Sequence, residues 1–201
     1  MFALVESGSI TKMLSGNRGI TIDGIQHPRA IYTLWTEAER NAIGIYTVEI
    51  DNSKKKNQEW YINTNITYAF SGGKVTGSYG DATAKAHADS NFTAEDEEDG
   101  LGTEGELKDR GLKYKLIENV KAQAAGILSN TDWYVTRKSE KNTAIPSAIT
   151  THRNAVRSKQ AAMETAITNA SDTPALETLY TFTKQDDGSI TRPLGELPTL
   201  E

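Results

Sequence analysis

The chain contains no cysteine in its 201 residues, which excludes disulfide frameworks, thiolate metal sites and cysteine nucleophiles. It also has little positive charge, because the formal net charge is −5 and the sequence pI is about 5.3. Nucleic-acid binding depends on clustered lysine and arginine, so these values argue against a nucleic-acid partner. The one dense basic run, at residues 54–56, stands beside Asp51 and Glu59 and is typical of a solvated loop.

Long apolar runs are absent as well. No stretch approaches the roughly 20 residues that span a bilayer, and the mean hydropathy is −0.54. The start, Met1 to Glu6, lacks the basic residues and the apolar run of a signal peptide. We therefore expect a soluble chain made in the cytosol, with no membrane partner.

Residues in a catalytic arrangement are equally scarce. The three histidines, His27, His87 and His152, stand at no metal-ligand spacing and have no carboxylate set that suggests a triad. No nucleophile elbow, Walker loop or dinucleotide fingerprint occurs. Residues 72–74 resemble a phosphate loop only superficially, and a hairpin turn explains them. We expect no catalytic residue, no cofactor and no metal.

Residues 1–85 show the pattern of a small, hairpin-rich α+β domain. Short apolar strands are expected at 2–6, 10–14, 20–22, 45–50, 66–70 and 74–79. Asp23-Gly24 suits a tight turn, because both residues tolerate a positive φ. Thr36 and Glu39 form a capping-box pattern that predicts a short helix at 37–43, which Gly44 ends.

The composition changes after residue 85. The stretch 86–105 contains five consecutive acidic residues, 95–99, and almost no large apolar side chain, which predicts an acidic, glycine-containing linker. The spacing of the carboxylates does not match a calcium-binding loop, so a solvated hinge is the favoured interpretation over a metal site.

The remaining residues are expected to form a helical hairpin at 106–172 and an extended segment at 173–201. Apolar residues recur at helical spacing in two stripes, Leu112, Leu116, Val120, Ala124 and Ile127, then Ile149, His152, Val156, Met163 and Ile167. Thr131 and Asp132 suit a turn and a helix cap between them, and Pro146 suits a helix start. His152 is expected to be a seam residue, with a pH-sensitive contact as the alternative. A helix pair of this kind is thin, which favours packing on another surface.

Large aromatic residues anchor either a core or an interface. Core packing is favoured for Trp35 and Trp133, whereas Trp60 and Tyr61 suit either role equally. Trp133 is expected to plug the bend of the hairpin. Arg137 and Arg153 are expected to meet local carboxylates or helix C-terminal carbonyls.

Residues 127–157 resemble a recurrent C-terminal module of tailed bacteriophages. The module reads L-x-x-T-D-W-x-x-x-R, then a loop with proline, then Y-R-x-x-L/V-R. The matching residues here are Thr131, Asp132, Trp133, Arg137, Pro146, Arg153 and Arg157. The chain departs from it at His152, where tyrosine is usual, and at Val156, where leucine is commoner. The segment 34–48 is similar to a second theme of small phage tail proteins, W-S/T-x-x-E-R-x-x-x-G-I-Y. The acidic middle of the chain resembles neither.

This resemblance implies a non-enzymatic tail protein of the virion. We expect it to be associated with the fibre or baseplate, to be present in several copies and to contact other phage tail proteins. The alternative is a tail fibre assembly chaperone that is not retained in the virion. The candidates for partner binding or for closing the hairpin are Trp35, Trp60, Tyr61, Asp132, Trp133, Arg137, His152, Arg153 and Arg157.

Overall fold

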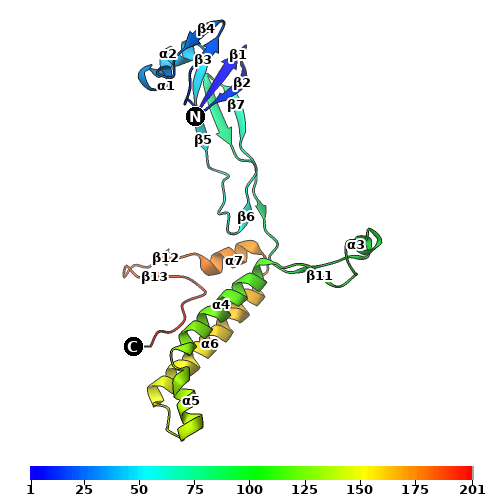
Figure 1. Ribbon diagram of the computed structural model, residues 1–201, viewed down its shortest axis with the longest axis vertical. Coiled ribbons are helices and arrows are strands. Elements are labelled where there is room, and N and C mark those ends of the chain that lie inside the picture. Colours follow the sequence, from blue (N-terminus) through cyan, green and yellow to red (C-terminus); the bar gives the residue numbers. More distant parts are fainter. Residues whose placement is uncertain (201) are drawn as a thin grey trace. The chain divides into compact units, whose positions relative to one another are not determined.

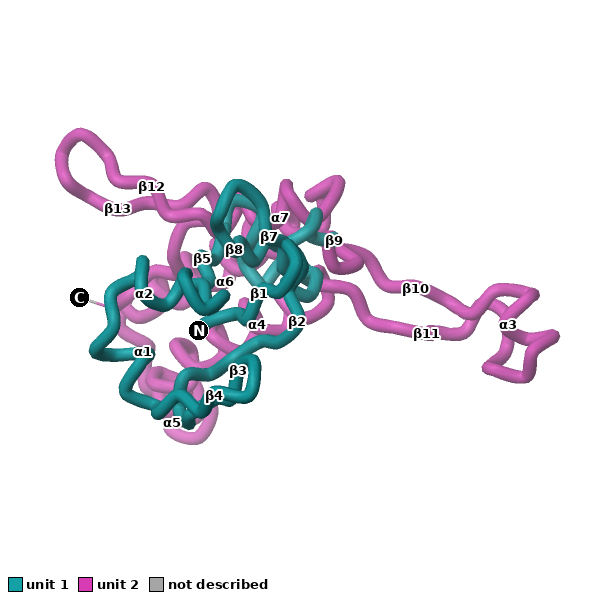
Figure 2. Tube along the Cα trace, turned by 90° about the horizontal axis from the view of Figure 1, so that it is seen from above, with its two compact units in different colours: residues 1–83 teal, residues 84–201 magenta. Residues whose placement is uncertain are grey.

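The chain combines a mixed β-sheet near its N-terminus with a helical region nearer its C-terminus, which confirms the α+β class expected from the sequence. The computed structural model describes residues 1–200 (Figure 1). The chain divides into unit 1, residues 1–83, and unit 2, residues 84–201, which are coloured teal and magenta in Figure 2. Strand β9 (Thr83–Ala84) lies at the boundary.

A five-stranded sheet forms the body of unit 1. Its strand order is β2 (Ser9–Leu14), β1 (Phe2–Glu6), β5 (Ile45–Asp51), β8 (Lys74–Ser78), β7 (Thr67–Ser71). All neighbours are antiparallel except β5 and β8, which are parallel. The tight turn between β1 and β2 works because Ser7 and Gly8 both adopt a positive φ, 51° and 79°.

Strand β1 is buried on both faces, and two apolar clusters result. Ala3 and Val5 pack with Val48 and Val75 on one face. The other cluster contains Leu4, Leu14, Ile22, Ile31, Tyr32 and Ile45. The elements that bring residues to this second cluster are the hairpin of β3 (Ile20–Ile22) and β4 (Ile25–His27) and helix α1 (Ile31–Leu34). Helix α2 (Glu37–Ala42) follows them.

The local signals read from the sequence of unit 1 are confirmed. Asp23 and Gly24 have φ values of 48° and 78° in the β3–β4 turn. The Thr36 side chain accepts from the Glu39 backbone N–H while the Glu39 carboxylate accepts from the Thr36 backbone N–H, so the capping box is complete. Gly44 ends α2 with a φ of 79°. The remaining strand of unit 1, β6, is Tyr61–Ile62.

Two long helices lie side by side in unit 2, α4 (Leu112–Ser129) and α6 (Ser147–Asn169), with α5 (Asp132–Lys141) between them in the chain (Figure 1). The two predicted stripes form the seam between them. Its buried residues are Leu116, Val120 and Ala124 from α4 and Ile149, His152, Arg153, Val156, Met163 and Ile167 from α6. The helical hairpin is therefore confirmed, although its connection contains a helix of ten residues.

The prediction of an acidic linker at 86–105 is wrong. This stretch holds β10 (Ser90–Asn91) and α3 (Ala94–Glu98), and β10 pairs with β11 (Leu107–Asp109). We call residues 90–109 the acidic arm. Three local interactions order it despite its composition, because the Thr93–Asp96 capping box starts α3, Lys108 pairs with Asp96 at 2.6 Å and the Phe92 ring covers Gly102.

The prediction of an extended segment at 173–201 is also wrong in its first part, where helix α7 (Thr173–Tyr180) forms. The Asp172 carboxylate accepts from the Ala175 N–H at 2.8 Å, which caps the helix, and Leu176 is fully buried. A turn at residues 186–188 joins β12 (Thr183–Lys184) to β13 (Ile190–Thr191).

Candidate functional site at the α5 end of the helical hairpin

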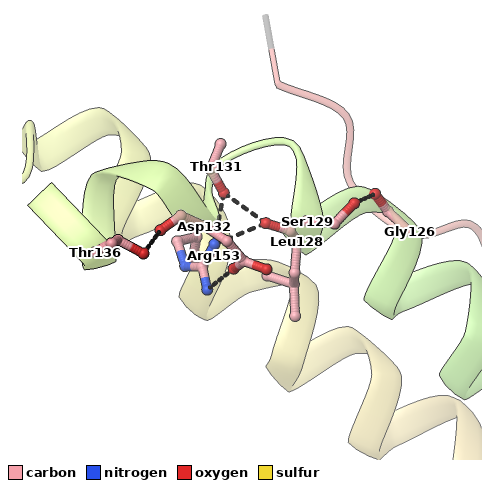
Figure 3. A network of polar contacts seen from close by, with 7 residues as sticks. All are labelled: Gly126, Leu128, Ser129, Thr131, Asp132, Thr136 and Arg153. Carbon is pink, nitrogen blue, oxygen red and sulfur yellow. Dashed lines mark hydrogen bonds and ion pairs between the residues drawn. The ribbon is translucent and has the colours of Figure 1, made fainter.

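The buried guanidinium of Arg153 joins all three helices of the hairpin (Figure 3). From α6, it donates to the Leu128 carbonyl at 2.8 Å, to Thr131 Oγ1 at 2.7 Å and to Asp132 Oδ1 at 2.8 Å. The arginine side chain is 8% exposed, whereas that of Asp132 is 60% exposed. A buried charge is tolerated when its donors are satisfied, and these acceptors meet that need.

The Leu128 carbonyl is the centre of this network. It accepts from the Thr131 N–H at 3.0 Å and the Thr131 hydroxyl at 3.0 Å as well as from Arg153. The last carbonyls of a helix have no intrahelical partner, so these bonds satisfy the end of α4. The network therefore sets the direction in which α5 leaves α4. We call Leu128, Thr131, Asp132 and Arg153 the arginine lock.

The contacts of Thr131 differ from the helix cap expected from the sequence, whereas those of Arg153 agree with the expectation. Thr131 occupies the N-cap position of α5, but its side chain makes no capping bond because it is engaged with Leu128 and Arg153. Arg153 meets a carboxylate and a helix C-terminal carbonyl, as its position in the sequence suggested.

Helix α5 carries an aromatic and cationic face next to the lock. The Trp133 and Tyr134 rings have centroids 3.8 Å apart. The guanidinium carbon of Arg137 lies 4.7 Å from the Trp133 centroid and 5.2 Å from the Tyr134 centroid. Residues four apart on a helix are neighbours, which places Lys138 and Lys141 beside this group. We call Trp133, Tyr134, Arg137, Lys138 and Lys141 the α5 face.

The α5 face is open to solvent. Trp133 is 51% exposed, so the prediction that it plugs the hairpin bend and packs in a core is wrong. Arg137 contacts the rings instead of a carboxylate, and its buried Nε atom has no hydrogen-bond acceptor. A planar guanidinium on an indole face holds both groups in place, so the exposed ring is restrained rather than free to turn.

The other aromatic candidates lie in unit 1 and are not part of this site. Trp60 and Tyr61 are 3% and 6% exposed, so both are core residues. Trp35 is half-buried against the cluster beneath α1, with its ring edge-on to His27 at a centroid distance of 5.8 Å. None of the three presents an open surface for a partner.

The last two candidates lie on α6. His152 is buried in the seam, as its place in the stripe indicated. Arg157 is exposed and borders a shallow groove along α6 with Leu128, Gln160 and Glu164. Tyr134, Lys138 and Lys141 were not among the residues expected from the sequence. On a helix, residues three or four positions apart lie on one face, so the positions of these residues relative to Trp133, Arg137 and one another predict that they share a surface.

The described residues contain no group of three or more histidine, aspartate or glutamate side chains that could hold a metal ion. Within the same part of the chain, no helix combines the length and the apolar character needed to cross a membrane. The α5 end presents two stacked aromatic rings and three cations beside the hydrogen-bonded Leu128 carbonyl.

No family model matches the chain, and comparisons with curated proteins and with solved structures give no match.

Proposed function

We propose that this chain is a non-enzymatic structural protein of a bacteriophage tail, associated with the fibre or baseplate, and that it binds a neighbouring tail protein through the α5 face. The observation that carries the proposal is the exposure of Trp133 on a restrained helix, with half of its surface open and Arg137 stacked on its ring. Tryptophan and arginine are the residues most enriched among those that dominate binding energy at protein interfaces.

The arginine lock supports this role because it restrains the site before a partner arrives. Binding costs free energy when side chains and helices must be ordered. Here, the end of α4 and the start of α5 are already joined through Arg153, which lies 21 residues beyond Asp132 in the chain. A preorganised aromatic face loses less freedom on binding than the same residues on a loop.

The resemblance to the phage module gains a physical interpretation from the same contacts. Of its seven matching residues, Thr131, Asp132 and Arg153 belong to the lock, and Trp133 and Arg137 belong to the α5 face. The contacts of the module's residues therefore fix the start of α5 and restrain the exposed ring of Trp133. This agrees with a module that recurs among proteins which bind different tail components.

The test is mass spectrometry of gradient-purified virions, with the copy number of the chain measured against the major tail proteins. Stoichiometric presence is expected. A phage that encodes Trp133→Ala should assemble virions depleted of this chain, while Leu34→Ala, which truncates a side chain 79% exposed in unit 1, should leave its copy number unchanged. Absence of the chain from virions, together with abundance in the lysate, would overturn the structural role in favour of an assembly chaperone.

A further inference from the structure

The acidic arm carries a strong local negative charge. Its carboxylates are Glu95, Asp96, Glu97, Glu98, Asp99, Glu104, Glu106 and Asp109, and its only basic residue is Lys108. Lys108 pairs with Asp96, which leaves most of the carboxylates without a cation in the described residues. Leu101 stands 61% exposed beside them. Leu107 is also exposed, at 41%, so the arm presents two apolar side chains among its carboxylates.

The arm is ordered rather than flexible. The Phe92 N–H donates to the Glu106 carbonyl and the Gly105 N–H donates to the Phe92 carbonyl, both at 2.9 Å. The hydrogen bond from Lys108 is the largest of the effects that lower the pKa of Asp96 to about 2, and the hydrogen bonds from Thr93 lower it further. An ordered surface of this kind can bind a complementary partner at a smaller entropic cost than a disordered acidic segment can.

The α5 face has the complementary chemistry. Lys138 and Lys141 form no ion pair in the described part of the chain. The guanidinium of Arg137 stacks on the two aromatic rings, and its buried Nε has no hydrogen-bond partner among the described residues. The exposed surfaces of Trp133 and Val135, 51% and 44%, add apolar area. Two carboxylates lie on the same helix, that of Glu140, which lowers the net charge of the surface, and that of Asp132, which pairs with Arg153.

The two surfaces lie at opposite ends of the same helix. The arm ends at Asp109, just before α4 begins at Leu112, whereas α5 follows the last residue of α4, Ser129. A helix of 18 residues is about 27 Å long, so the arm of one chain is held away from its own α5 face. The complementary surfaces can therefore meet only between chains.

We infer that the acidic arm of one copy of this chain docks on the α5 face of a second copy, in a head-to-tail contact. Leu101 would pack against the apolar part of the face, and the carboxylates around it would meet Arg137, Lys138 and Lys141. Because the two surfaces differ, the contact is heterologous and continues from copy to copy into a ring or an open filament. This inference rests on the proposed protein-binding role of the α5 face and names its partner.

The experiment is sedimentation velocity of the full chain over a range of concentrations from about 1 μM to about 1 mM. The weight-average mass of the natural chain should rise with concentration at roughly 0.1 M salt and fall back toward that of the monomer at roughly 1 M salt, where charges are screened beyond about 3 Å. Two variants reverse the charge of one surface each. The arm variant is Glu98→Lys/Asp99→Lys/Glu104→Lys/Glu106→Lys, which leaves four carboxylates against five lysines in the arm, and the α5 variant is Lys138→Glu/Lys141→Glu. Each alone should associate at least about tenfold more weakly, because like charges then face each other.

An equimolar mixture of the two variants should associate again, since each reversed surface then meets an oppositely charged partner. The matched control is Lys54→Glu/Lys55→Glu in unit 1, which has the same net charge as the α5 variant but leaves the arm and the α5 face intact, so it should associate as strongly as the natural chain. The inference is overturned if the natural chain stays monomeric, if the mixture of the two variants does not associate, or if the Lys54/Lys55 control is weakened as much as the α5 variant. Circular dichroism confirms the fold of each variant. Failure here, with the chain still stoichiometric in virions, would leave the proposed function standing with another partner.

Discussion

Arg153 and Asp132 form an ion pair at 2.8 Å in which the cation is buried and the anion is mostly exposed. This asymmetry determines which partner matters for stability. Arg153 also donates to Leu128 and Thr131, so its removal breaks two further hydrogen bonds beside the ion pair, while removal of Asp132 breaks only the ion pair, whose anion is exposed. We therefore expect the bonds from Arg153 to Leu128 and Thr131 to contribute more to stability than its ion pair with Asp132 does.

Arg153→Met should lower the free energy of unfolding of unit 2 by about 2 kcal/mol, because the hydrogen bonds from a charged donor to Leu128 and Thr131 are lost. Asp132→Ala should cost less than about 1 kcal/mol, because an exposed ion pair contributes little in water. Urea unfolding followed by the helical circular dichroism signal measures both. Equal losses for the two variants would show that the ion pair, and not the bonds to Leu128 and Thr131, carries the stability.

Trp133→Ala should change the free energy of unfolding by less than about 1 kcal/mol, as expected for an exposed side chain away from a core. Trp60→Ala should cost about 3 to 5 kcal/mol, since its side chain is 3% exposed and a cavity would remain. Thermal and urea unfolding of the full chain measure the difference. A large loss of stability in the Trp133 variant would contradict a surface role for that ring.

The carboxyl group of Asp96 should titrate with a midpoint near pH 2, below its ordinary pKa of 3.8. Because the pKa is lowered in the folded arm, the contacts of Asp96 stabilise the arm fully above about pH 4 and are lost as the pH falls through about 2. Lys108→Met should raise the midpoint but leave it below 3.8, since the bonds from Thr93 remain. NMR titration of the carboxyl carbon measures both midpoints. An unchanged value in the variant would show that Lys108 is not the main cause.

Gly44→Ala should destabilise unit 1 more than Gly73→Ala. Both glycines have a positive φ, 79° and 76°, which costs an alanine about 1 kcal/mol or more. A Cβ at Gly44 would also lie 2.7 Å from the Val5 carbonyl oxygen, whereas one at Gly73 meets nothing within 4 Å. We expect a further loss of at least about 1 kcal/mol for Gly44 from this overlap. Similar unfolding midpoints for the two variants would contradict the close approach.

The local elements of this fold were predictable because their causes lie within a few residues of one another. The turn at Asp23-Gly24 and the capping box of Thr36 and Glu39 each depend on a short stretch of sequence. The helical stripes were predictable for a similar reason, since their period shows which side of a helix is buried. The buried position of His152 follows from that stripe.

The acidic arm shows how composition misleads. The stretch around residues 95–99 is rich in charge and poor in apolar residues, which indicates a linker. The capping box of Thr93 and Asp96 was as visible as that of Thr36 and Glu39, but the contribution of Lys108 depends on a hairpin that brings it back across 12 residues.

The sequence by itself determined the α+β class, the capped helix α2, the turn at Asp23-Gly24 and the two helices of the hairpin, because these depend on local spacing and composition. Only the tertiary structure decided that Trp133 faces solvent, that Arg153 bonds to residues 21 to 25 positions earlier, and that the acidic arm and the α5 face lie at opposite ends of one helix. The physical reason is that burial and long-range hydrogen bonding depend on which helices pack together, and that packing follows from the chain as a whole.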